Sequence, residues 1–140
     1  MIILDTNVLS EVARQAPDAD VLAWLDSLPA AEVATTAITA AELLYGVTRL
    51  PDGHRKSSLT AAVHALVNDD FHGRVEPFDA PAAAQYAVVV GEREKLGLPI
   101  SAADAQIAAI CRARQATLAT RNTKDFEETG IELVNPWHAR

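Results

Sequence analysis

The chain has 140 residues, a formal net charge of −7, 49% hydrophobic residues and 22% charged residues. This length suits a single domain, residues 1–140, that buries its own core, and the balance of residue types is ordinary for a globular protein. The excess of acids argues against a protein that holds nucleic acid by its overall field, although bound divalent cations reverse such a field locally.

Apolar runs alternate with segments of helical spacing along the whole chain. The first half predicts a strand at 2–4, a helix that begins with Thr6 and Asn7, a helix at 21–28, a strand at 32–38 and helices at 39–50 and 59–71. The second half predicts a strand at 74–78, helices at 79–97 and 101–115, a strand at 116–120, a short helix at 122–130 and a strand at 131–135. This alternation predicts an α/β fold, a three-layer sandwich with a mainly parallel central sheet flanked by helices.

The sequence shows no pattern typical of export or of a membrane anchor. Cys111 is the single cysteine, so an internal disulfide is impossible and a reducing compartment is expected. No signal peptide is visible after Met1, and the apolar runs are too short to span a bilayer. We therefore expect a cytoplasmic protein.

Three acids stand alone in otherwise apolar stretches. Each is the only charged residue of its stretch: Asp5 in 1–10, Glu42 in 33–48 and Asp104 in 100–111. Each is expected in, or just before, the first turn of a helix that follows an apolar segment. In open parallel sheets, sites form outside the carboxyl ends of the strands, where such residues can meet.

Helix capping is the alternative explanation for these acids. The segments TAAE (39–42) and SAAD (101–104) both match a capping box, in which the acid answers a Ser or Thr cap. Asn7 could likewise cap the first helix. Taken singly, each acid is best explained as a cap, whereas taken together they lie in the most apolar parts of the chain, where solvated caps are not expected.

Converging carboxylates would repel one another and need a cation among them. Two charges 4 Å apart at an effective dielectric constant near 20 cost on the order of 4 kcal/mol. Oxygen ligands without a nearby His or Cys pattern favour Mg²⁺ or Mn²⁺ over zinc. The three acids, if they converge, therefore predict a hard-metal site.

Four separated motifs carry a resemblance to a known family. They are LDTNVLSE around Asp5, ITAAELLYGV around Glu42, ISAADAQIAAI around Asp104 and LATRNTKDF at 118–126. In this order they resemble PIN domains, and in particular the VapC-type ribonuclease toxins of prokaryotic toxin–antitoxin pairs. The resemblance extends from Met1 to about Trp137.

This resemblance implies a Mg²⁺-dependent endoribonuclease, with Mn²⁺ able to substitute. It implies that Asp5, Glu42 and Asp104 are metal-binding and catalytic carboxylates gathered at the strand ends. A metal-activated water would attack phosphorus and leave 5′-phosphate and 3′-hydroxyl ends. The substrate would be RNA read as an exposed single strand.

The fourth motif departs from the family pattern. Many members place an acid directly after the TR pair, where this chain has Asn122. Asp125 is the next acid, and it either serves catalysis through a water or only caps the short helix. Thr120 and Asn122 are polar supports in the same segment. Because of this departure, the number of bound metals, one or two, stays open.

The resemblance also implies partners. A small antitoxin would insert its tail into the acidic cleft, often with an arginine that pairs with the carboxylates. A homodimer is expected from the family, and DNA would be bound only through the antitoxin. The predicted helical hairpin at 39–70 offers either a groove for a partner helix or a face covered by the protein's own core.

Several basic and aromatic residues lie near the last motifs or in the predicted helices. Four cations could bind phosphates, although solvated helix ends are the favoured explanation: Arg112, Arg114, Arg121 and Lys124. Trp24 and Trp137 could stack on bases, but packing is favoured for both. Cys111 is expected to be a small core residue.

Two other functions fit the sequence less well. A receiver-like module needs a pair of acids after the first strand, and LDTN supplies only Asp5, with Asn7 where aspartyl-phosphate hydrolases place a second aspartate. A catalytically degenerate PIN-fold binding protein would keep the fold and only engage a partner. The intact trio of acids argues against degeneracy, and Asn122 keeps it open.

Overall fold

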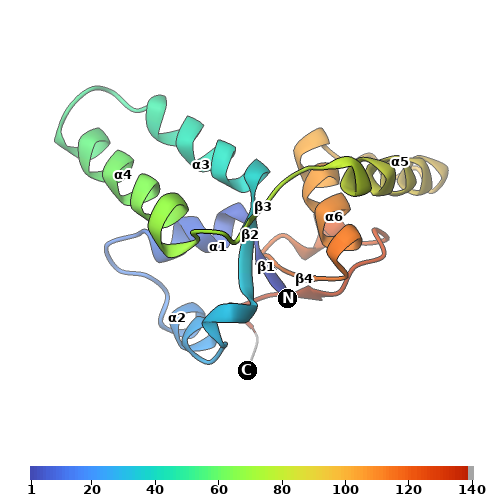
Figure 1. The fold of residues 1–140 in the computed structure, drawn as a ribbon, viewed down its shortest axis with the longest axis horizontal. Helices are drawn as coiled ribbons and strands as arrows, with labels where there is room; N and C mark the ends of the chain where they lie inside the picture. The colour runs from blue at the N-terminus through green and yellow to red at the C-terminus, as the bar shows by residue number, and fades with distance from the viewer. Residues whose placement is uncertain (139–140) are drawn as a thin grey trace.

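Within residues 1–138, which the computed structural model describes, five strands form one parallel sheet (Figure 1). The strands are β1 (Ile2–Leu4), β2 (Val33–Thr36), β3 (Val75–Glu76), β4 (Thr117–Ala119) and β5 (Leu133–Val134). Their order is β3-β2-β1-β4-β5, and each neighbouring pair is parallel. The first strand of the chain therefore lies in the middle of the sheet.

Helices supply the crossovers that parallel strands require. They are α1 (Thr6–Val12), α2 (Ala19–Asp26), α3 (Ala37–Thr48), α4 (His54–Ala65), α5 (Ala80–Lys95) and α6 (Ala102–Arg114). Among the described residues they are accompanied by three shorter turns of helix, namely the 3₁₀ turns η1 (Ala30–Glu32) and η3 (Thr123–Phe126) and the π turn η2 (Leu66–Asp70). The antiparallel α3–α4 hairpin projects to one side in Figure 1, with α5 and α6 on the other.

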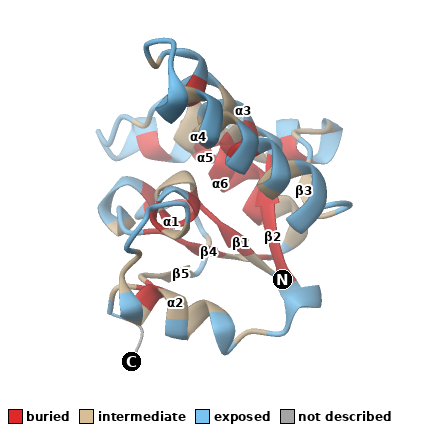
Figure 2. Ribbon diagram, turned by 90° about the vertical axis from the view of Figure 1, so that its left-hand side faces the viewer, coloured by how far each residue is buried: buried red, intermediate tan, exposed pale blue. Residues whose placement is uncertain are grey.

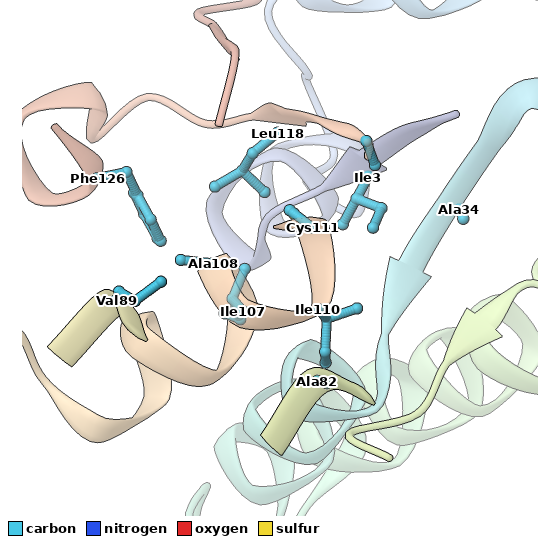
Figure 3. Close-up of a cluster of buried hydrophobic side chains, with 11 residues drawn as sticks. Ile3, Ala34, Ala82, Val89, Ile107, Ala108, Ile110, Cys111, Leu118 and Phe126 are labelled. Atoms are coloured by element: carbon cyan, nitrogen blue, oxygen red, sulfur yellow. The ribbon is translucent and has the colours of Figure 1, made fainter. Parts of the chain in front are cut away.

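Alternation along β1 divides the core into two layers of packing. Successive strand residues point to opposite faces, so Ile3 and Leu4 enter different clusters. The cluster around Ile3 packs the sheet against α5 and α6, as Figure 3 shows for Ala82, Val89 and Ile107. The cluster around Leu4 packs the other face against α1 and α2 through Val8, Leu9 and Val21. Figure 2 shows the buried strands between these layers, and the predicted three-layer α/β sandwich is confirmed.

The second strand is shorter than predicted. It ends at Thr36 rather than at residue 38, because the Thr36 hydroxyl accepts a hydrogen bond from the Thr39 backbone N–H (3.0 Å) and starts α3 there. Similarly, the segment predicted as a helix at 122–130 forms only η3, because the backbone becomes extended at Glu127. Length and termini were therefore the inaccurate part of the prediction.

The carboxyl ends of β1 and β4 emerge side by side. Leu4 pairs with Ala119 in the parallel register, and the Asp5 backbone N–H donates to the Ala119 carbonyl oxygen (2.9 Å). Asp5 and Thr120, the next residue of each strand, are therefore neighbours at one edge of the sheet. No helix within residues 1–138 is long and apolar enough to cross a membrane.

Candidate active site

Asp5 is a nearly buried carboxylate at the end of the central strand. Its residue is 5% exposed, and it caps α1 by accepting a hydrogen bond from the Thr6 backbone N–H at Oδ1 (2.8 Å). The capping alternative named Asn7 as the cap of this helix, but the cap is Asp5 itself. The second oxygen, Oδ2, points to neighbouring polar groups.

Thr120 and Asn7 hold that second oxygen in place. The fully buried Thr120 hydroxyl donates to Asp5 Oδ2 (2.8 Å), and the Asn7 side-chain amide lies 3.3 Å from the same oxygen. Asn7 Nδ2 also lies 3.3 Å from Thr120 Oγ1, and its Oδ1 accepts from the Arg121 backbone N–H (3.1 Å). This network ties the end of β1 to the end of β4 and fixes the orientation of the carboxylate.

Glu42 reaches the same place from α3. Because α3 begins at Ala37, Glu42 lies in its second turn and not at the third position of a capping box. The capping box predicted at 39–42 is therefore wrong, since Thr36 supplies the cap. Glu42 Oε1 instead accepts a hydrogen bond from the Thr6 hydroxyl (2.9 Å), which brings its carboxylate toward the start of α1.

Asp104 combines a helix-start position with a place at the site. Ser101 caps α6, and its hydroxyl accepts from the Asp104 backbone N–H (3.2 Å), so the Ser-cap half of the predicted capping box is present. The Asp104 side chain is partly exposed and faces a pocket that Asp5 also lines.

This open pocket, of about 500 Å³, brings three of the four candidate acids together. Its lining residues are Asp5, Thr6, Asn7, Ser10, Glu11, Arg14, Glu42, Asp104, Arg121, Asn122 and Trp137. Among residues 1–138, no three His, Cys, Asp or Glu side chains already stand close enough together to form a preformed metal cage. The acids thus surround a space wide enough for water, instead of touching a common point.

Burial and mutual repulsion make the charged forms of Asp5 and Asp104 unfavourable. Burial raises the pKa of the Asp5 carboxyl; hydrogen bonds from Thr120, Thr6 and Asn7 oppose this rise, and the charge of Asp125 adds to it. Burial also raises the pKa of Asp104, with repulsion from Asp5 as the next cause. Both carboxylates would therefore gain from a cation placed between them.

The donor set suits a magnesium-like cation. The side chains that face the pocket supply carboxylate and hydroxyl oxygens, and the described residues that line it include neither His nor Cys. Mg²⁺ keeps several of its waters and is commonly held by only one or two carboxylates, so it fits spaced acids better than a tight cage. The residues present therefore fit the metal that the sequence predicted.

Asp125 lies apart from the pocket wall. It is exposed on η3, and its backbone N–H donates to the Asn122 carbonyl oxygen (3.0 Å). Asp125 does not line the pocket, whereas Asn122 does. Its charge still raises the pKa of both Asp5 and Asp104, so it lies within electrostatic reach of the site.

The candidate cations have different surroundings. Arg112 Nε donates to Gln85 Oε1 (2.9 Å), and Arg114 forms a salt bridge with Asp79 (3.0 Å), so both support the fold and are not solvated helix ends. Lys124 is exposed on η3. Arg121 lines the pocket, and its guanidinium lies over the Trp137 ring.

The remaining sequence candidates are core residues. Trp24 and Trp137 both pack, partly buried, against the cluster around Leu4, as expected. Cys111 is fully buried, and burial raises the pKa of its thiol to about 12, so it stays a neutral thiol in the core.

Sequence reasoning missed one wall of the pocket. Asn7, Ser10, Glu11 and Arg14 follow the helical spacing i, i+3, i+4 and i+7, which places them on one side of α1 and its end. The buried Glu11 accepts from the Asp18 backbone N–H (3.0 Å) and pairs with Arg14 (3.1 Å). Read as a polar face beside Asp5, this spacing could have identified the wall.

Comparisons with known proteins agree over almost the whole chain. A family model described as PIN domain matches residues 2–132. The chain is 44% identical over 138 residues to the toxin FitB of Neisseria gonorrhoeae, covering 99% of each. It is 39% identical over 137 residues to a VapC ribonuclease of Sinorhizobium fredii, covering 98% of each.

Solved structures are similar to this chain over nearly its whole length. The chain is similar to one in a crystal structure of FitAcB from Neisseria gonorrhoeae, with a TM-score of 0.92, 43% identity and 99% coverage of both chains. It is also similar to a chain in a structure of FitAB bound to a DNA fragment, with a TM-score of 0.93, 42% identity and coverage of 100% and 98%.

Proposed function

This chain belongs to the PIN-domain family, and on that basis we propose that it is a divalent-metal-dependent endoribonuclease and the toxin of a toxin–antitoxin pair. The family predicted from the four motifs is confirmed by the match over residues 2–132. The observation that carries the proposed activity is the pocket that Asp5, Glu42 and Asp104 line from the end of β1, from α3 and from α6.

The chain's own residues divide the work of hydrolysis. Asp5 and Asp104 would hold Mg²⁺ or Mn²⁺, and Glu42 would complete the ligand set or orient the attacking water. When bound, the cation supplies an activated water and offsets the charge that develops on the phosphate. Thr120 and Asn7 keep the Asp5 carboxylate aimed at the pocket through the contacts described above.

Asp125 has a supporting role in this proposal. Asp125 is exposed and does not line the pocket, whereas Asn122 does. Asp125 thus acts at longer range than the other three acids. We propose that it strengthens the attraction for cations at this end of the sheet.

The relatives support an antitoxin and DNA as partners. The gonococcal relative is named a toxin, and a structure similar to this chain contains FitAB on DNA. We propose a small antitoxin whose tail enters the acidic pocket, a homodimer of this chain, and contact with DNA only through the antitoxin. The proposed site of action is the cytoplasm.

Cleavage of RNA tests the proposal directly. We expect purified, antitoxin-free protein to cut a mixed pool of single-stranded RNA in Mg²⁺ or Mn²⁺ and to be inactive with a chelator. The new ends should be 5′-phosphate and 3′-hydroxyl, because water attacks phosphorus and the 3′ oxygen is the leaving group. Absence of cutting together with absence of a metal-induced rise in Tm would favour the alternative, a catalytically degenerate PIN-fold binding protein.

Thr120→Val is expected to weaken metal binding without unfolding the protein. Valine keeps the shape of threonine but removes the hydroxyl that donates to Asp5 Oδ2 (2.8 Å), and losses of such outer contacts cost about 10- to 100-fold in metal affinity. Titration calorimetry with Mn²⁺ measures the change. Thr120→Ser should restore affinity, and Thr117→Val at the other end of β4 is the matched control.

A further inference from the structure

Arg121 is a cation on the wall of an acidic pocket, and no acid among residues 1–138 forms a salt bridge with it. The other arginine of that wall, Arg14, is neutralised by Glu11 (3.1 Å). In the part of the chain that the structure describes, Arg121 forms no salt bridge, and its side chain donates no hydrogen bond. Its charge is therefore available to something that enters the pocket.

The position of Arg121 is fixed relative to Asp5. Its backbone N–H donates to Asn7 Oδ1 (3.1 Å), and the preceding residue, Thr120, donates to Asp5 Oδ2 (2.8 Å). The guanidinium carbon lies 4.8 Å from the centre of the Trp137 ring, which packs against the cluster around Leu4. Backbone and side chain are thus both held, and Arg121 lines the same pocket as the three acids.

An arginine held in this way is suited to a phosphate. A guanidinium that rests on an aromatic face keeps its N–H donors at its edge, and their fork matches two phosphate oxygens. The acids repel an RNA backbone, so a strand needs a cation beside them as well as a metal among them. Every internal phosphate of a strand has a neighbour on each side, so a strand cut at the acids presents another phosphate to the pocket wall.

We propose that Arg121, supported by Trp137, binds the RNA phosphate adjacent to the one that is cut. This inference rests on the proposed ribonuclease function and adds a residue that positions the strand, instead of one that takes part in the chemistry. Trp137 acts through Arg121, because its ring limits where the guanidinium can go.

Salt dependence of RNA binding tests this assignment. The probe is a fluorescein-labelled single-stranded 12-nucleotide RNA, followed by anisotropy in Ca²⁺, which takes the same kind of oxygen ligands as Mg²⁺. We expect Arg121→Gln to weaken binding about tenfold, as for the loss of a charge-assisted hydrogen bond. The slope of log K against log salt should become less steep by about 0.7, the value for one phosphate on a single strand. In cleavage assays, KM should rise while kcat changes little.

Matched variants separate this role from folding and from overall charge. Lys124→Gln removes an equal charge from exposed η3 outside the pocket and should leave the slope unchanged. Trp137→Phe should retain most of the binding, because it keeps an aromatic ring under the guanidinium. An unchanged slope and KM in Arg121→Gln, in a protein that cuts RNA, would overturn the phosphate site alone. A reduced slope in a protein that never cuts RNA would overturn the proposed function and leave the site standing.

Discussion

Asp5→Asn is expected to lower RNA cleavage by roughly 10³-fold while making the metal-free protein more stable. Loss of a metal-binding carboxylate removes several kcal/mol of transition-state stabilisation, and each 1.4 kcal/mol is a factor of ten in rate. Asparagine caps a helix as well as aspartate does, so α1 should keep its start at the Thr6 N–H. Steady-state cleavage of a defined RNA measures the loss.

The stabilisation has an electrostatic cause. Asp5 is 5% exposed, and removing its charge also relieves the repulsion that raises the pKa of Asp104. We expect a gain of about 1 kcal/mol in the free energy of unfolding without metal, or a Tm about 3 °C higher. Added Mg²⁺ should raise the Tm of the unaltered protein and cancel this advantage, because in the proposed site the cation binds through the Asp5 carboxylate that the variant lacks.

The sign of the pH dependence follows from the same shifts. The pKa values of Asp5 and Asp104 are raised above 3.8, so between 3.8 and their folded values the native state holds protons that the unfolded chain has released. Stability of the metal-free protein therefore falls as pH rises through this window, and the fall should be shallower in Asp5→Asn. Asp69→Asn, an exposed change on η2, serves as the control. A metal-free Asp5→Asn protein less stable than the control would contradict the account.

Arg93→Met is expected to lower the free energy of unfolding by about 3 kcal/mol, more than any other substitution considered. Arg93 is 5% exposed on α5, and its guanidinium donates to three backbone carbonyl oxygens: those of Leu98 (2.9 Å), Pro99 (3.2 Å) and Glu127. Methionine fills the same space but leaves these buried carbonyls without their donor, and hydrogen bonds from a charged group contribute about 1.5–3 kcal/mol each. Urea denaturation measures the change.

Arg93 also connects two parts of the candidate site. Leu98 and Pro99 lie just before Ser101, which caps the helix of Asp104, and Glu127 follows η3. Arg93→Lys should lose less stability, because it keeps one charged donor. Arg55→Met, an exposed change on α4, should stay within about 0.5 kcal/mol. Equal losses in the Arg93 and Arg55 variants would show that the buried guanidinium does not hold these segments.

The charge of Asp5 favours metal binding at the candidate site but lowers the stability of the metal-free fold. Burying the charge of Asp5 costs folding free energy when no metal is bound. Hydrogen bonds from Thr120, Asn7 and the Thr6 backbone N–H nevertheless fix the orientation of this carboxylate. Such local cost at a preorganised site is common where function needs it. Metal affinity and folding stability should therefore trade against each other across variants of this network.

The sequence alone determined the layers of the fold and the three acids worth following. Strand and helix periodicities depend on neighbours within one turn or one pleat, so they can be read locally, and the parallel three-layer sandwich followed from their alternation. A lone acid in an apolar stretch is also a local observation, and it identified Asp5, Glu42 and Asp104. The order of the motifs indicated the family.

Only the tertiary structure decided how these residues act together. Whether Glu42 caps a helix or faces a pocket depended on where α3 begins, and the Thr36 hydroxyl sets that start by accepting a hydrogen bond from the Thr39 backbone N–H. The links from Asp5 to Thr120, 115 positions away, and from Arg121 to Trp137 arise because parallel register and side-chain packing bring distant segments together. Such long-range contacts leave no periodic pattern in the sequence, because they form only when all the strands of the sheet come together.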